Sequence, residues 1–180
     1  MPGLPKTTWF TKETQCNKLL APASLLEKYE GAVFLPLYSA SVTVDGGETG
    51  RGRSSGHAYS PDGALDVQLR MPVEMGGKGG GTNPEQLFAA GFAACFHGSL
   101  VLAATRQRLR LPADLGLVAT ATIGRDPEDG LFALKLSVDV SLPGMARAEA
   151  ETLIAEAEII CPYAKMARKG VEQSIRLVAG

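Results

Sequence analysis

Three cysteines, at positions 16, 95 and 161, are the residues of this chain best suited to chemistry. A thiol that reduces a peroxide must react as the thiolate, with a pKa below the free value of about 8.5. An arginine beside the sulfur favours that charge, and a carboxylate can hold the arginine in place. A second cysteine can then trap the sulfenic acid as a disulfide. Cys95 and Cys161 could form such a pair, or they could be buried core residues, since free cysteine is among the most buried residue types.

The other potential ligands argue against a metal site or a disulfide-stabilised scaffold. The chain has no CxxC motif, and its two histidines, His57 and His97, lie far apart. Zinc sites need clustered ligands, and disulfide scaffolds need an even set of cysteines. We therefore expect no metal or other cofactor, and we expect Cys16 to be a bystander thiol.

Composition is typical of a globular protein of near-neutral charge. A length of 180 residues suffices for one domain with a buried core. The net charge of −1 gives no basic footprint for nucleic acid, and we expect no apolar run of about 18 residues that could cross a membrane. We expect a cytoplasmic location. A mitochondrial one has only weak support, because residues 1–34 contain glutamates but no arginine.

Two helices are expected to carry Cys95 and Cys161. The first should span residues 84–107, because Asn83 is a favourable N-cap and a proline follows it. Alanine and glycine crowd its first turns, which lets other backbone come close and indicates a buried central helix. The second helix should span residues 146–161, with apolar residues at helical spacing, and it ends where the next proline stops it.

Five strands are expected around these helices, over residues 37–44, 64–71, 117–123, 132–140 and 171–178. The order ββα-ββα-β places the chain in the α+β class. Within the fourth strand, the even-numbered residues from Phe132 to Val140 should face inward. Residues 35–180 then form the main domain, and residues 1–34 form an N-terminal extension of unknown role with a short helix over residues 23–30.

Helix geometry separates Cys95 from its polar neighbours in the sequence. His97 points to nearly the opposite side of the helix, about 200° away, which excludes a local Cys–His dyad. Glu85 lies about 15 Å earlier along the axis and roughly 80° around it. If Cys95 and Glu85 serve one site, either the helix is bent or the two groups come from two subunits.

Residues 82–96 have the sequence TNPEQLFAAGFAACF, which closely resembles the signature of the organic hydroperoxide resistance (Ohr) proteins, one branch of the OsmC-like superfamily. Residues 161–168, CPYAKMAR, are similar to the second-cysteine motif of that family. The resemblance covers about residues 37–178. It implies an OsmC/Ohr-like fold, which is an intertwined homodimer with active sites at the subunit interface.

The resemblance implies a thiol-dependent peroxidase in which Cys95 is the peroxidatic cysteine and Cys161 the resolving one. Glu85 matches the family's glutamate, which pairs with a catalytic arginine. Members of the family prefer fatty-acid and alkyl hydroperoxides to hydrogen peroxide. They are re-reduced by lipoylated proteins or dihydrolipoamide, without metal or flavin.

The catalytic arginine falls in a segment that departs from the family pattern. The family has Gly-Gly-Arg soon after the first strand, whereas here Glu48 follows the two glycines and the next loop looks about five residues longer. Alignment on residues 56–63 places Arg53 at the arginine position, and Arg51 is the second choice.

The lining of the substrate site has two readings. Phe92 and Phe96 could line a channel for an alkyl chain or could be ordinary core residues, since large aromatic residues fill cores anyway. His97 stands where the family usually has another residue and is expected to alter the lining. The alternative function is a non-enzymatic redox sensor or a hydrophobic-ligand-binding protein on the same scaffold.

Overall fold

The structure is a computed structural model that describes residues 25–48 and 55–177. The chain divides into two compact units, with the boundary between Tyr38 and Ser39, and each unit is described by itself. In the first unit, residues 25–27 form a turn and a bend, and residues 28–30 have no regular structure. The short helix expected over residues 23–30 is therefore wrong for its described part.

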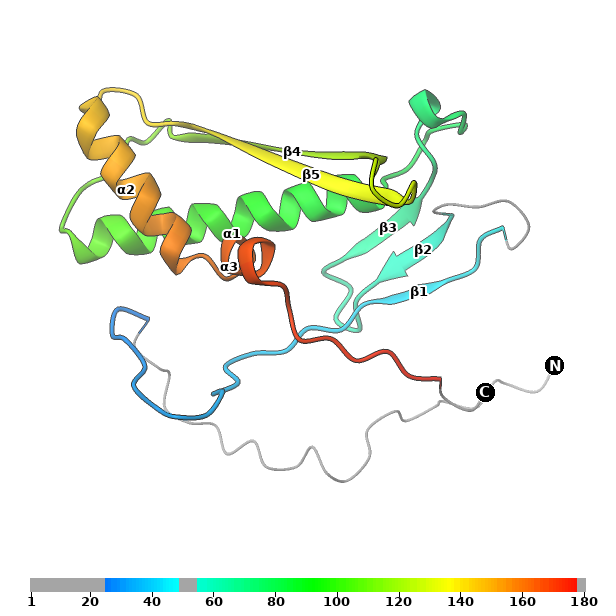
Figure 1. Cartoon of the computed structure of the whole chain (residues 1–180), viewed down its shortest axis with the longest axis horizontal. Helices are drawn as coiled ribbons and strands as arrows, with labels where there is room; N and C mark the ends of the chain where they lie inside the picture. The colour runs from blue at the N-terminus through cyan, green and yellow to red at the C-terminus, as the bar shows by residue number, and fades with distance from the viewer. Residues whose placement is uncertain (1–24, 49–54, 178–180) are drawn as a thin grey trace. The chain divides into compact units, whose positions relative to one another are not determined.

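The second unit holds the helices and strands (Figure 1). They are β1 (Thr43–Asp45), β2 (Gly56–Tyr59), β3 (Asp66–Leu69), the 3-10 turn η2 (Val73–Met75), α1 (Pro84–Arg106), β4 (Gly116–Arg125), β5 (Phe132–Ser141), α2 (Arg147–Ile160) and α3 (Pro162–Lys169). The α+β class is confirmed. The observed order is βββα-ββαα. The predicted order is wrong at three places, because it lacks β2 and α3 and adds a C-terminal strand where residues 171–177 form none.

Helix α1 begins and ends close to the predicted positions. The Asn83 side chain accepts a hydrogen bond from the Gln86 backbone N–H at 2.8 Å, and Pro84 takes the first helical position, where its missing N–H costs no hydrogen bond. One face of α1 is buried, through Phe92, Phe96, Ser99, Leu100, Ala103 and Ala104. Other positions, among them Ala94 and Val101, are exposed. The predicted central helix is therefore buried on one face only within this chain.

Helix α1 is also more apolar than the sequence analysis expected. Its best 18-residue window has a mean hydropathy of 1.8, so by length and composition alone it could cross a membrane. The core helix of a globular protein passes the same test. Because α1 packs against β4, α2 and α3, we interpret it as a core helix.

The hairpin of β4 and β5 lies along α1, and α2 packs against the same helix (Figure 1). The two strands are antiparallel and pair without interruption from Gly116 with Ser141 to Arg125 with Phe132. Leu136, Val138 and Val140 pack on the core as predicted. Phe132 and Leu134 are 56% and 54% exposed, so the inward-facing prediction is wrong at the turn end of the strand.

The first sheet contains a strand that the sequence analysis missed. β2 pairs with both β1 and β3 in antiparallel fashion, and its sequence, GHAY, contains no β-branched residue that would signal a strand. Of the strand predicted over residues 37–44, only the end is observed, as β1. Pairing with β2 is confined to Thr43–Asp45, and residues 37–42 form no strand. An isolated bridge from Leu69 to Thr82 joins this sheet to the segment just before α1.

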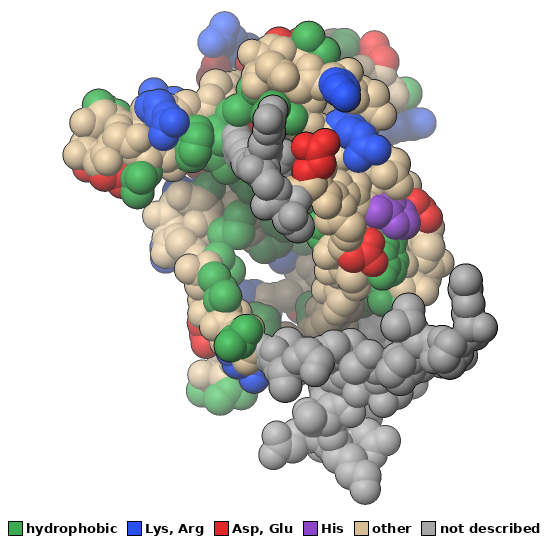
Figure 2. Space-filling model, turned by 90° about the vertical axis from the view of Figure 1, so that its right-hand side faces the viewer, with side chains coloured by type: hydrophobic (Ala, Val, Ile, Leu, Met, Phe, Trp, Pro, Cys, Tyr) green, Lys and Arg blue, Asp and Glu red, His purple; other side chains and the backbone are tan. Residues whose placement is uncertain are grey.

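The C-terminal segment, residues 171–177, forms no strand in the described part of the chain. Val171, Ile175 and Leu177 are 64%, 90% and 102% exposed. The alternation typical of a strand is present, but no strand among the described residues pairs with this segment. Hydrophobic side chains also reach the surface elsewhere, as the face in Figure 2 shows.

Candidate active site

Cys95 and Cys161 meet in space although 66 residues separate them. Their Sγ atoms lie 3.4 Å apart, with the Cys161 thiol placed to donate to Cys95. Cys161 is fully buried in the core, and Cys95 is half-buried at its edge. A disulfide bond is about 2.05 Å long, so a small movement brings these sulfurs to bonding distance.

Local structure explains the position of Cys161. The backbone turns at this residue, which ends α2 and serves as the N-cap of α3. Pro162 cannot continue α2, but it suits the first position of α3. The Ala164 N–H donates to Cys161 Sγ at 3.5 Å. The sulfur therefore lies at the N-terminus of α3, where the helix dipole favours negative charge.

Tyr163 holds the start of α3 close to α1. Its ring makes an edge contact with Phe92, with centroids 6.2 Å apart. A Cβ atom added to Gly91 would lie 3.3 Å from the Tyr163 ring. Glycine at position 91 therefore allows the two helices to approach at the thiol pair. The sequence signal for this contact was the run of small residues before Cys95.

Among the described residues, burial raises the pKa of the Cys95 thiol. The neighbouring Cys161 thiol also raises it, and the backbone N–H of Tyr163 lowers it. Because burial is the largest cause, the net direction is opposite to the one that a peroxide-reducing thiolate needs. Arg53 and Arg51, the candidate cations, lie outside the described residues, as does Cys16.

The structure does not bring Glu85 to Cys95 within one chain. Glu85 lies in the first turn of α1 and is half-buried. Helix α1 continues without interruption from Pro84 to Arg106, so the separation of about 15 Å along the axis remains. Over Pro84–Arg106 the helix has no break that would bring the two side chains together in one chain.

A mainly apolar pocket of about 550 Å³ lies between α1, α2, α3 and β5, and α1 and α3 are the helices that carry or adjoin the two thiols. It is lined by Phe88, Phe92, Phe96, Leu134, Lys135, Leu136, Val138, Val140, Ile154, Glu158, Ala164, Ala167 and Arg168. Phe92 and Phe96 are at once pocket-lining and core residues, being 4% and 5% exposed. Arg168 forms an ion pair with Glu158 at 2.7 Å and supplies polar groups that the sequence analysis did not identify. His97 is exposed and does not line this pocket.

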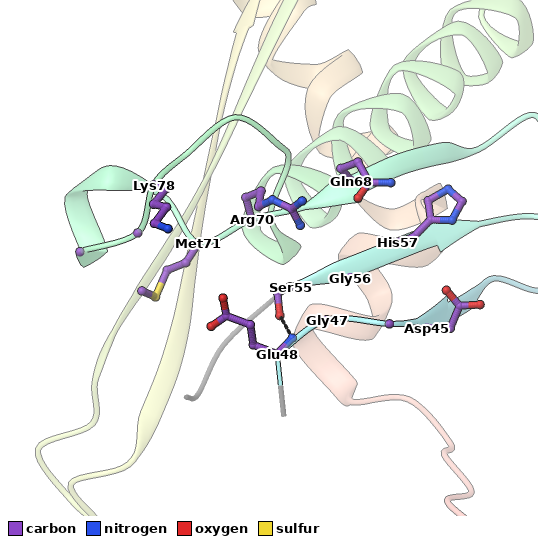
Figure 3. A pocket seen from close by; sticks show the side chains of 13 residues that line it. Asp45, Gly47, Glu48, Ser55, Gly56, His57, Gln68, Arg70, Met71 and Lys78 are labelled. Atoms are coloured by element: carbon purple, nitrogen blue, oxygen red, sulfur yellow. Dashed lines mark hydrogen bonds between the residues drawn. The ribbon is translucent and has the colours of Figure 1, made fainter. Parts of the chain in front are cut away.

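A second pocket, of about 850 Å³, lies at the first sheet (Figure 3). Its wall includes Arg70, Lys78 and Glu48, and the Ser55 side chain accepts a hydrogen bond from the Glu48 backbone N–H at 2.8 Å. Neither cysteine of the pair lines it. Over residues 25–48 and 55–177, no group of three or more His, Cys, Asp or Glu side chains could hold a metal ion.

Comparison with known proteins identifies similar sequences and folds. A family model described as OsmC-like protein matches residues 77–176. The chain is 42% identical over 142 residues to an organic hydroperoxide resistance protein of Xanthomonas axonopodis pv. citri, covering 78% of this chain and 94% of that one.

Solved structures give the same result. The organic hydroperoxide resistance protein of Legionella pneumophila matches with a TM-score of 0.66 and 38% identity, over 77% of this chain and 95% of that one. The protein OhrB of Bacillus subtilis matches with a TM-score of 0.64 and 37% identity, over 76% and 96%. The fold is therefore that of the OsmC and Ohr proteins.

Proposed function

The chain belongs to the OsmC-like family and resembles its organic hydroperoxide resistance proteins over most of its length, and on this basis we propose that it is a cysteine-based peroxidase. Its substrates are organic hydroperoxides, including alkyl and fatty-acid hydroperoxides, and its products are the alcohols. We further propose that it acts in the cytoplasm as part of the response to oxidative stress.

One observation carries the mechanism, namely the 3.4 Å between Cys95 Sγ and Cys161 Sγ. Two core cysteines that only fill space have no need to approach each other. Here a close approach of the helices at Gly91 accompanies the sulfur contact. Of the two readings left open by the sequence, the redox pair is therefore better supported than the core-filling one.

The reaction that we propose begins at Cys95. The Cys95 thiolate attacks the outer oxygen of the hydroperoxide, the O–O bond breaks, and the alkoxide leaves and takes up a proton to give the alcohol. Cys95 is left as the sulfenic acid. The Cys161 thiol then attacks the Cys95 sulfur, water leaves, and a disulfide forms before further oxidation.

Activation of Cys95 needs a positive charge, because the described surroundings raise the pKa of its thiol. We assign this role to Arg53, with Arg51 as the second candidate. A guanidinium beside the sulfur lowers the thiol pKa and also stabilises the negative charge that develops on the leaving oxygen. Glu85 orients the arginine through a charge-assisted hydrogen bond.

A homodimer with shared active sites would reconcile Glu85 with Cys95. The unbroken helix α1 keeps the two groups about 15 Å apart in one chain, so a second copy could supply the charged half of the site. The exposed apolar residues of α1 and of the C-terminal segment are consistent with a partner surface. The alternating pattern of residues 171–177 suits a strand that pairs outside its own chain.

The pocket lined by Phe92 and Phe96 is suited to the alkyl part of the substrate, because its wall is mainly apolar. The same pocket supports the alternative function of a hydrophobic-ligand binder or non-enzymatic sensor. The reductant that we propose is a lipoylated protein or dihydrolipoamide, since a dithiol can open a protein disulfide and close into its own.

Steady-state consumption of cumene hydroperoxide with dihydrolipoamide tests the proposal. We expect turnover by the wild-type protein and none by Cys95→Ser. The Cys161→Ser variant should react about once per site and then accumulate Cys95 as the sulfinic acid, which mass spectrometry detects as a gain of two oxygen atoms.

Hydrogen peroxide serves as the matched substrate, and we expect it to be consumed more slowly. A binder or sensor would consume neither peroxide with dihydrolipoamide. Unchanged turnover in Cys95→Ser would exclude Cys95 as the nucleophile.

A further inference from the structure

The two sulfurs of the pair differ in their access to solvent. Cys161 is 0% exposed, whereas Cys95 is half-buried at the edge of the core. An external thiol that opens a disulfide must reach one of the two sulfurs, and the outcome depends on which sulfur is accessible. Because the sulfurs are already 3.4 Å apart, forming the disulfide requires no rearrangement that would reverse this difference.

The residues around Cys161 explain why its sulfur is inaccessible to solvent. The core residues Leu153 and Ala157, both 0% exposed, belong to the same buried cluster. The first turn of α3 also lies against the sulfur, since Ala164 is 5% exposed and its N–H donates to Sγ. A thiol reductant would have to displace part of the core to attack Cys161.

The same surroundings favour Cys161 as the leaving group. When a disulfide is attacked at one sulfur, the other departs with a negative charge, and departure is faster when that charge is stabilised. The Ala164 N–H points at Cys161 Sγ, and Cys161 holds the N-cap position of α3. An N–H donor and the positive end of a helix dipole both stabilise a departing thiolate.

We propose that the reductant attacks the disulfide at Cys95 and that Cys161 leaves as the thiolate at the start of α3. The reductant thiolate forms a bond to Cys95 Sγ, the Cys95–Cys161 bond breaks, and its electron pair stays on Cys161 Sγ. When the reductant is a dithiol, its second thiolate then attacks its first sulfur, which is bonded to Cys95 in the mixed disulfide. The bond to Cys95 breaks, and Cys95 leaves as the thiolate. The dithiol loses two electrons and the protein disulfide gains them.

This order has a consequence for the reaction cycle. It rests on the proposed function only in requiring a Cys95–Cys161 disulfide. The hydroperoxide and the reductant would both react at Cys95, so one entrance serves both and they cannot be bound at once.

The experiment traps the first mixed disulfide in the full chain with Cys16→Ser as background. Diamide forms the disulfide without any peroxidase activity, so failure of the proposed function does not affect the test. A brief pulse of 2-mercaptoethanol is stopped with acid, free thiols are then blocked with N-ethylmaleimide at low pH, and peptides are analysed by mass spectrometry. We expect mercaptoethanol on Cys95 and maleimide on Cys161, with at least about tenfold preference.

Two single-cysteine variants provide a second measurement. In the same background, Cys161→Ser leaves Cys95 as the thiol, and Cys95→Ser leaves Cys161. We expect 5,5′-dithiobis(2-nitrobenzoate) to react at least about tenfold more slowly with Cys161 than with Cys95. Mercaptoethanol mainly on Cys161, equal labelling of the two, or no Cys95–Cys161 disulfide after diamide would each overturn the proposal.

Discussion

The two halves of the candidate site differ in how much of each lies within one chain. The sulfur half is complete, since Cys95 and Cys161 approach to 3.4 Å through α1 and the start of α3. The charged half is seen only in part, since Glu85 lies about 15 Å along α1 from Cys95 and Arg53 and Arg51 lie outside the described residues. Packing within one chain therefore brings the two sulfurs together, whereas the sharing of Glu85 between subunits remains a proposal. Substitutions can therefore perturb the charged half and the sulfur half separately.

The largest effect is expected from the arginine of the charged half. Arg53→Gln should lower kcat/KM for cumene hydroperoxide by about 10²–10³, the usual loss when a group that stabilises developing charge is removed. It should also raise the pKa of Cys95, because the burial that already raises it is then unopposed. The pH profile of alkylation by iodoacetamide measures this shift, and its midpoint should move to higher pH.

Arg51→Gln is the matched control for this prediction. It removes the same charge two residues away, and we expect kcat/KM to fall less than about threefold. A larger loss in Arg51→Gln than in Arg53→Gln would assign the role to Arg51. Loss in neither variant would contradict activation by an arginine of this loop.

The next effect concerns Glu85 and the proposed sharing of sites. Glu85→Gln should lower kcat/KM by roughly 10–100-fold, the equivalent of one charge-assisted hydrogen bond. Coexpressed Glu85→Gln and Cys95→Ser chains, purified through two different tags, should recover about half of the wild-type activity, because a two-fold dimer then contains one intact shared site. If the mixed dimer is no more active than Glu85→Gln alone, the two residues do not serve a shared site.

The smallest effect is expected in the sulfur half. Gly91→Ala places a Cβ atom 3.3 Å from the Tyr163 ring, so α3 must shift by a few tenths of an ångström. Disulfide formation from the sulfenic acid should slow by roughly threefold, with a matching rise in over-oxidised Cys95. Stopped-flow measurement of sulfenic acid decay gives this rate.

Gly98→Ala is the control for helix propensity. It lies on the same helix, and nothing in the described chain lies within 4 Å of the added Cβ atom. Both substitutions replace a helical glycine by alanine and so favour the helix by about 0.5–1 kcal/mol. Equal rates of disulfide formation in the two variants would show that the contact with Tyr163 does not position Cys161.

The sequence predicts the helices better than the strands, for reasons visible in particular residues. Asn83 and its following proline mark the start of α1 because helix capping is local. β2 escaped prediction because GHAY contains no β-branched residue and is too short to show alternation, and its pairing with β1 and β3 is not local. Residues 171–177 have the pattern of a strand, but they pair with no strand in the part of the chain that the structure describes.

The candidate site shows the same contrast between local sequence signals and contacts that are distant in the sequence. That Cys95 lies within a helix and Cys161 at a helix end could be read from local patterns, but their contact spans 66 residues and was implied only by resemblance to a family. The pKa direction of Cys95 depends on burial, which no local pattern reports. The roles of Arg53, Arg51 and Glu85 remain predictions.

The contact between Cys95 and Cys161 also makes oxidation a change in chain topology. A bond across 66 residues closes a loop whose unfolded ensemble loses entropy worth about 4 kcal/mol. The oxidised protein should therefore melt higher than the reduced protein, by on the order of 10 °C. Each catalytic cycle would thus form and then reduce a covalent cross-link in the folded chain. A melting curve would report the redox state of the protein without any chromophore.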